Sequence, residues 1–172
     1  MKAITLIILS VSVWSCAERM DEDPALSTIL TVGKKMPSFV YTTPDGVEKS
    51  SDDLKGKVIL INFFATWCGP CIKELPYLQE KVYETIQDQE FVLLCLGREH
   101  NAEELNVFAE QKKLNLPFYP DPDRKIYSLF AEKFIPRNFL INREGTVIFE
   151  GTGFEKNEFD SMVKLIETEL DH

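Results

Sequence analysis

The sequence has few of the cysteines and histidines that bind zinc and lacks the spacings that arrange them. Its 172 residues include four cysteines and two histidines, with one Cys-x-x-Cys pair and neither a second such pair nor a His-x-x-x-His spacing. A structural zinc site takes four ligands of this kind. The sequence therefore predicts no metal and no cofactor, and the single Cys-x-x-Cys pair needs another explanation.

Basic side chains are also too few for a partner that carries many negative charges. Lysine and arginine number 19 against 28 aspartates and glutamates, which gives a net charge of −9. This sign is unfavourable for binding nucleic acid or an anionic lipid surface. The chain shows no internal repeats, and its length and 44% hydrophobic content predict a single domain with an ordinary core, which we expect to be a monomer.

No apolar run reaches the roughly 20 residues that cross a bilayer, but the amino terminus carries a shorter one. Lys2 precedes an apolar segment over residues 3–14, and the chain turns acidic soon after Cys16. A short basic start, an apolar centre and a polar continuation are typical of an export signal. We predict a signal peptide over residues 1–15, an acidic tether over residues 16–31 and one folded domain over residues 32–172.

The same segment resembles a bacterial lipoprotein signal, in which the cysteine becomes the acylated amino terminus after cleavage in front of it. The resemblance implies that Cys16 carries the lipid. The protein would then be exported and anchored to a membrane, facing the periplasm or the cell exterior. Each buried CH₂ of an acyl chain contributes about 0.8 kcal/mol to such anchoring. The alternative is an ordinary secretory signal in which Cys16 is incidental.

Cys68 and Cys71 form the Cys-x-x-Cys pair, at a predicted junction between a strand and a helix. Residues 58–64 are an apolar run typical of a strand buried on both faces, and apolar residues recur at helical spacing from Ile72 onward. Cys68 would cap the first helical turn, where free backbone N–H groups and the helix dipole favour a thiolate. Cys71 lies one turn further on. We predict Cys68 as the nucleophile and Cys71 as the thiol that resolves a mixed disulfide.

The residues around the pair have predicted roles as well. Pro70 stiffens the first turn, where its missing N–H has no intrahelical acceptor. Gly69 lets a partner chain approach closely, and Trp67 presents an apolar docking surface beside the pair. Simple packing is the alternative for Trp67.

Residues 62–76, centred on Trp67-Cys68-Gly69-Pro70-Cys71, resemble the active-site segment of the thioredoxin superfamily, in particular of the TlpA and ResA type of membrane-tethered extracytoplasmic thiol-disulfide oxidoreductases. The resemblance extends from about residue 32 to the end of the chain. It implies an α/β thioredoxin fold, with a central mixed β-sheet flanked by helices and an N-terminal β-hairpin extension. Alternating segments on either side of a Pro-Asp-Gly turn at residues 44–46 predict that hairpin.

Pro136 matches a second position of the resembled family, where a proline with a cis peptide bond lies against the active-site disulfide. The match implies that the backbone of Ile135 can pair with an extended substrate peptide beside Cys68. Arg137 and Asn138 stand where threonines are common, which leaves the preferred peptide open. A trans proline that only begins a strand is the alternative.

Glu74 is the candidate that accepts the proton of Cys71. Asn62 stands where thioredoxins carry a buried aspartate, so that acid-base group is missing. Glu74 lies one helical turn after Cys71, where a partly buried carboxylate can accept the proton and keep a high pKa. A glutamate is also found at this place in the resembled ResA type. The alternative is a solvated helix glutamate.

Three further predictions concern the second half of the chain. Cys95 lies inside an apolar run and is predicted to be a small hydrophobic core residue rather than a redox thiol. His100 follows in a polar loop without a visible acidic or cysteine partner, so we interpret it as a loop residue. A short helix is predicted over residues 124–133.

The predicted function is thiol-disulfide exchange with protein substrates. The Gly-Pro dipeptide between the cysteines resembles thioredoxin, with a potential of about −270 mV, rather than oxidants near about −120 mV. We therefore predict a reductant that receives electrons from a membrane-embedded donor. One alternative is a peroxiredoxin-like thiol peroxidase, although Ala65 stands where that motif has a hydroxyl. Another is a redox-dependent module that binds peptides at Ile135 and Pro136.

Overall fold

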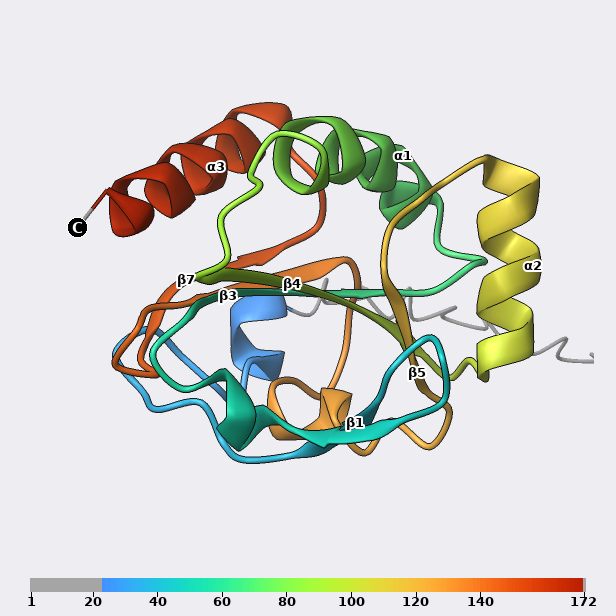
Figure 1. Cartoon of the computed structure of the whole chain (residues 1–172), viewed down its shortest axis with the longest axis horizontal. Helices are drawn as coiled ribbons and strands as arrows, with labels where there is room; N and C mark the ends of the chain where they lie inside the picture. The colour runs from blue at the N-terminus through green and yellow to red at the C-terminus, as the bar shows by residue number, and fades with distance from the viewer. Residues whose placement is uncertain (1–22, 172) are drawn as a thin grey trace, which may run out of the picture.

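A five-stranded mixed sheet forms the centre of the computed structural model, which describes residues 23–171 (Figure 1). The strand order is β5-β4-β3-β6-β7, with β3, β4 and β5 parallel and β6 and β7 antiparallel to their neighbours. The strands are β3 (Val58–Phe64), β4 (Phe91–Arg98), β5 (Phe118–Asp121), β6 (Arg137–Ile141) and β7 (Val147–Thr152). Residues 1–22, which include the predicted signal and Cys16, lie outside the described residues.

β3 is the central strand, and all seven of its residues are buried. Successive side chains of a strand point to opposite faces of the sheet. Leu60 and Phe64 accordingly pack into the core on the helix-covered face, whereas Ile61 and Phe63 pack into a second core on the other face. This two-sided burial explains why the strand is apolar without alternation, as the sequence predicted.

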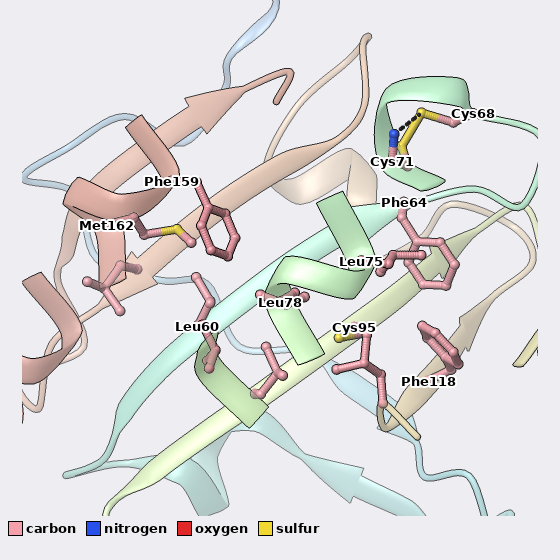
Figure 2. Packing of buried hydrophobic residues seen from close by; sticks show 14 of the residues in the cluster. Leu60, Phe64, Cys68, Cys71, Leu75, Leu78, Cys95, Phe118, Phe159 and Met162 are labelled. Atoms are coloured by element: carbon pink, nitrogen blue, oxygen red, sulfur yellow. Dashed lines mark hydrogen bonds between the residues drawn. A yellow bond between two sulfur atoms is a disulfide. The ribbon is translucent and has the colours of Figure 1, made fainter. Parts of the chain in front are cut away.

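Three helices contribute to the first core: α1 (Gly69–Leu78), α2 (Ala102–Lys112) and α3 (Lys156–Leu170). Figure 1 shows α1 and α3 side by side above the sheet, and Figure 2 shows residues of this core around β3. The α-helical geometry of α1 ends two residues after Pro76, and a π-helical turn, η3 (Gln79–Tyr83), follows. The predicted mixed sheet flanked by helices is confirmed.

The predicted N-terminal hairpin covers the opposite face. β1 (Val40–Thr42) pairs antiparallel with β2 (Glu48–Ser50), and a 3₁₀ turn, η2 (Ser51–Leu54), leads into β3. Tyr41 packs edge-on against Tyr119, and Phe39 packs in the same way against Phe130. These aromatic contacts join the hairpin to the second core.

The folded part begins before residue 32, which corrects the predicted tether. Residues 24–27 form a 3₁₀ turn, η1 (Pro24–Ser27), and Leu30 is buried. Backbone hydrogen bonds to residues 130–132 hold this segment, and so does Arg137, whose fully buried guanidinium donates to Pro24 O at 2.9 Å and Ser27 Oγ at 2.6 Å. A buried cation needs such acceptors, and the N-terminal segment supplies them.

The helix predicted over residues 124–133 is also corrected, because only a 3₁₀ turn, η4 (Tyr127–Leu129), forms there. Arg124 has a left-handed φ of 57°, which does not start a helix. The carboxylate of Asp121 accepts the backbone N–H groups of Ile126 and Tyr127 at 3.1 and 2.8 Å. These bonds replace the ones that a longer helix would have used. Within residues 23–171, no helix is long and apolar enough to span a membrane.

Candidate active site

Cys68 and Cys71 are joined by a disulfide bond at the start of α1 (Figure 2). Cys68 is the N-cap residue, with an extended backbone, and its sulfur accepts the Cys71 N–H at 3.3 Å. Gly69 and Pro70 form the first two positions of the helix and are exposed. The predicted strand-to-helix junction is therefore confirmed, and the sulfur of Cys68 lies where unpaired helix N–H groups favour a thiolate.

Two segments far apart in the sequence meet at the sulfur of Cys68. Its Sγ lies 3.6 Å from the carbonyl oxygen of Ile135, and the Ile135–Pro136 peptide bond is cis, as the resemblance implied. Trp67, directly before Cys68, exposes 61% of its surface. The structure thus brings an exposed aromatic ring, a sulfur and a loop backbone to one place.

A buried carboxyl group, that of Glu74, lies behind the disulfide on α1. Glu74 is 1% exposed, and its two oxygens accept hydrogen bonds from Asn62 Nδ2 at 3.0 Å and from Asn138 Nδ2 at 2.5 Å. Burial raises the pKa of Glu74 to about 7, and the negative charge of Glu158 adds to the rise, while the two amide bonds oppose it. The alternative of a solvated helix glutamate does not fit this burial.

Asn138 and Arg137 do not face a substrate, because both are buried. The amide of Asn138 serves Glu74, and the guanidinium of Arg137 holds the N-terminal segment. Both residues are evident in the sequence, but these partners are not. A buried strand that carries two polar residues in succession was the available signal, since such groups need internal partners.

Cys95 lies on β4 in the same core as the disulfide and is fully buried (Figure 2). Burial and, secondly, the charge of Glu74 raise the pKa of the Cys95 thiol well above its ordinary value. A thiol that stays protonated is a poor nucleophile, so the core interpretation is confirmed.

His100 is not the partnerless loop residue that the sequence suggested. It is 7% exposed, and its Nε2 accepts the backbone N–H of Thr66 at 3.1 Å. Its Nδ1 lies 3.4 Å from Glu104 Oε2. The sequence could not show the contact with Thr66, which is 34 residues away, whereas Glu104, four residues after His100, was a signal that the sequence contained.

Arg98 is a further neighbour of the site that sequence analysis did not identify. Its guanidinium carbon lies 5.7 Å from the ring centroid of Trp67 and 5.0 Å from that of Tyr127. A cation at this distance from an aromatic face is attracted to it. Arg98 therefore supports the exposed ring of Trp67 from one side. Residues 23–171 contain no group of three or more His, Cys, Asp or Glu side chains placed to hold a metal ion.

Comparisons with known proteins agree with this geometry. Residues 31–166 match the family model described as Redoxin. The chain is 32% identical to the thiol-disulfide oxidoreductase ResA of Bacillus cereus over 129 residues. This aligned region covers 75% of the chain and 74% of the relative. ResA of Bacillus subtilis is 32% identical over 124 residues, or 72% of this chain and 69% of the relative.

Solved structures share the fold. A putative protein disulfide isomerase from Bacteroides thetaiotaomicron superposes with a TM-score of 0.81 at 31% identity, covering 85% of this chain and 94% of that one. A putative thiol:disulfide interchange protein DsbE from Chlorobium tepidum has a TM-score of 0.69 at 24% identity over 82% of this chain and 99% of that one, which supports the fold alone. The chain therefore belongs to the Redoxin family and, within it, to the ResA-like thiol-disulfide oxidoreductases.

Proposed function

We propose that this oxidoreductase reduces disulfides in exported proteins, with Cys68 as nucleophile, Cys71 as resolving thiol and Glu74 as proton acceptor. The observation that carries the proposal is a disulfide at a helix start, with a buried carboxyl of pKa about 7 on the same helix. A general base is most effective when its pKa lies near the working pH.

The reaction begins from the reduced pair. The Cys68 thiolate attacks a substrate disulfide, which forms a mixed disulfide and releases one substrate thiolate. Cys71 then attacks Cys68 Sγ, so the Cys68–Cys71 bond forms, the mixed disulfide breaks and the second substrate thiolate leaves. The substrate gains two electrons, the cysteine pair loses two, and the Cys71 proton goes to the Glu74 carboxylate.

Glu74 must then return its proton to solvent, although it is almost fully buried. A small cavity of about 10 Å³ lies beside it, lined by Asn138, Gly151 and the exposed Glu158 among others. This is close to the smallest volume that holds one water molecule. The cavity supports a short route for the proton between Glu74 and the surface near the start of α3.

Substrate binding is assigned to the surface around Cys68. The exposed ring of Trp67 offers apolar contact, and the exposed Gly69 and Pro70 leave the approach to the sulfur open. The Ile135–Pro136 backbone lies against Cys68, where an extended peptide could pair with it. Protein disulfides or thiols are the proposed partners.

Direction and location rest on the sequence. The Gly-Pro dipeptide favours a low potential, and the amino-terminal segment favours export with a lipid on Cys16. A monomer held at a membrane, facing the periplasm or the cell exterior, would receive electrons from a membrane-embedded donor. Equilibration of the pair with glutathione tests the direction: we expect a potential near about −270 mV, and a value above about −150 mV would contradict a reductant.

The partners can be found by trapping. Cys71→Ser protein should retain substrates as mixed disulfides at Cys68, because the resolving thiol is missing, and Cys68→Ser protein should retain none. Full partner binding by Cys68→Ser protein would instead support a peptide-binding module. Rapid consumption of peroxide by the reduced protein would support the peroxidase alternative.

A further inference from the structure

His100 occupies a fixed position behind the loop that carries Cys68. The backbone N–H of His100 donates to the backbone oxygen of Gly97 at 3.2 Å. The next residue, Asn101, caps α2 and forms a reciprocal pair of hydrogen bonds with Glu104. The imidazole is therefore presented from a rigid corner between β4 and α2, and it is 7% exposed.

The contact with Thr66 determines which ring nitrogen carries the proton. Nε2 lies 3.1 Å from the backbone N of Thr66 and 3.3 Å from its Oγ1. A backbone N–H can only donate, so Nε2 must present its lone pair and the proton must be on Nδ1. Nδ1 lies 3.4 Å from Glu104 Oε2, and a carboxylate on that side favours this tautomer.

Thr66 is two residues before Cys68, in the connection from β3 to α1. The Cys68 N–H donates back to Ala65 O at 3.1 Å, which closes the turn. That bond encloses Thr66 but does not use its N–H, which is held by His100 alone among the hydrogen bonds of the described residues. The imidazole thus restrains the segment between the buried strand and the exposed Trp67.

We propose that His100 is a positioning residue for the exchange reaction: its neutral Nδ1–H tautomer holds the Thr66–Cys68 loop in place, and protonation of Nε2 releases that loop. A protonated Nε2 would set two N–H donors against each other, so the bond from the Thr66 backbone N–H would be lost, and Nε2–H could donate only to the Thr66 side-chain oxygen, 3.3 Å away. The inference rests on the proposed role of Cys68 as nucleophile. It adds a pH dependence that originates outside the cysteine pair.

The charged groups at this corner act in opposite directions on the imidazole. Glu104 on α2 favours the imidazolium, and its carboxyl pKa is held below the ordinary value by the Asn101 N–H and then by His100. Arg98, at the end of β4, carries a positive charge, which disfavours the imidazolium. It forms an ion pair with Glu99, with 3.5 Å between nitrogen and oxygen. In the loop between β3 and α1, the residue that contacts His100 is Thr66, which carries no charge.

Alkylation of Cys68 in the reduced protein tests the inference between about pH 5 and pH 8, where histidine changes charge. His100→Gln keeps an acceptor near Nε2 but cannot ionise, and His100→Leu removes the acceptor. The ratio of the His100→Gln rate to the wild-type rate should change across this pH range, because only the wild-type side chain can ionise. His100→Leu should change the rate about fivefold at about pH 8, as expected for one lost hydrogen bond, and this difference should shrink toward about pH 5, where the wild type has lost the same bond. A pH-independent ratio for His100→Gln, or a wild-type rate for His100→Leu at about pH 8, would overturn the proposal.

Nitrogen-15 chemical shifts of the wild-type imidazole provide a second, direct readout. We expect Nε2 to be unprotonated at neutral pH, as its contact with the Thr66 N–H requires, and the Thr66 amide signal to move when the pH is lowered to about 5. A proton on Nε2 at neutral pH would overturn the proposal. Neither readout uses an exchange partner, so a failed glutathione test would not affect them.

Discussion

Asn62 and Asn138 lie opposite each other on β3 and β6, and the side-chain amide of Asn62 donates to the amide oxygen of Asn138 at 2.9 Å. Both amides also donate to Glu74, so a cross-strand pair holds a carboxyl group of the helix above it. Donors on both oxygens favour the ionised carboxylate. The balance between these bonds and burial determines when Glu74 can accept a proton.

Replacing Glu74 with Gln should slow the resolution of the mixed disulfide by about a hundredfold near neutral pH, because the amide cannot take the Cys71 proton. The wild-type rate should fall as the pH is lowered through about 7, where Glu74 becomes protonated. Acid-quenched single turnovers with a peptide disulfide measure both effects. Glu110→Gln, at an exposed position of α2, is the control, and it should retain rapid resolution. Equal rates for Glu74→Gln and wild type at every pH would refute the assignment.

The stability of the protein should also depend on Glu74. Its pKa rises from an ordinary 4.5 in the unfolded chain to about 7 in the fold. The folded state therefore binds the proton more tightly, and this contribution, of about 3 kcal/mol, is present below pH 4.5 and is lost as the pH rises to about 7. Urea unfolding of wild type and Glu74→Gln across this window measures it. A constant difference between the two would show that the pKa is not raised.

Asn138→Leu should raise the pKa of Glu74 above about 7, because one donor to the carboxylate disappears while burial remains. The carboxyl stretching band of Glu74, identified by its loss in Glu74→Gln, reports the titration in the infrared. The resolution step should shift to higher pH in parallel. A lower pKa in Asn138→Leu would mean that the amide bond does not stabilise the carboxylate.

Cys95 should remain unreactive in the folded protein. Iodoacetamide should modify Cys68 in the reduced state and leave Cys95 unmodified until denaturant is added, as peptide mass spectrometry can show. Cys95→Ala should lower the free energy of unfolding by about 1 kcal/mol through lost packing. Its glutathione equilibrium should match that of the wild type, and a changed potential would give Cys95 a redox role.

Arg137→Met should free the N-terminal segment and lower the free energy of unfolding by about 2–4 kcal/mol. The guanidinium donates to Pro24, Ser27 and Thr28, and a thioether can replace none of these bonds. Limited proteolysis should cut near residues 23–30 in the variant before the wild type. Arg137→Lys keeps the charge without the planar fork and should give a smaller loss. If Arg137→Met and the wild type were equally protected from proteolysis in this segment, other contacts would hold it.

The sequence alone determined the elements whose signals are local. The apolar run of β3, the helical spacing after Ile72 and the Cys68–Cys71 pair all fall within one short stretch, and their physical meaning does not depend on distant residues. For the same reason Cys95, inside an apolar strand, was correctly assigned to the core. The resemblance in this stretch also led to the family and to the cis bond before Pro136.

Tertiary structure decided which polar groups become partners. Glu74 and Asn138 are 64 residues apart, Thr66 and His100 are 34 apart, and Arg137 and Ser27 are 110 apart. A buried donor or acceptor must find a partner inside the fold, but the sequence does not state which one. Sheet register and the corner between β4 and α2 bring these pairs together. The cysteines and Glu74 were therefore identified in the sequence, while the long-range partners of Glu74, His100 and Arg137 became visible only in the fold.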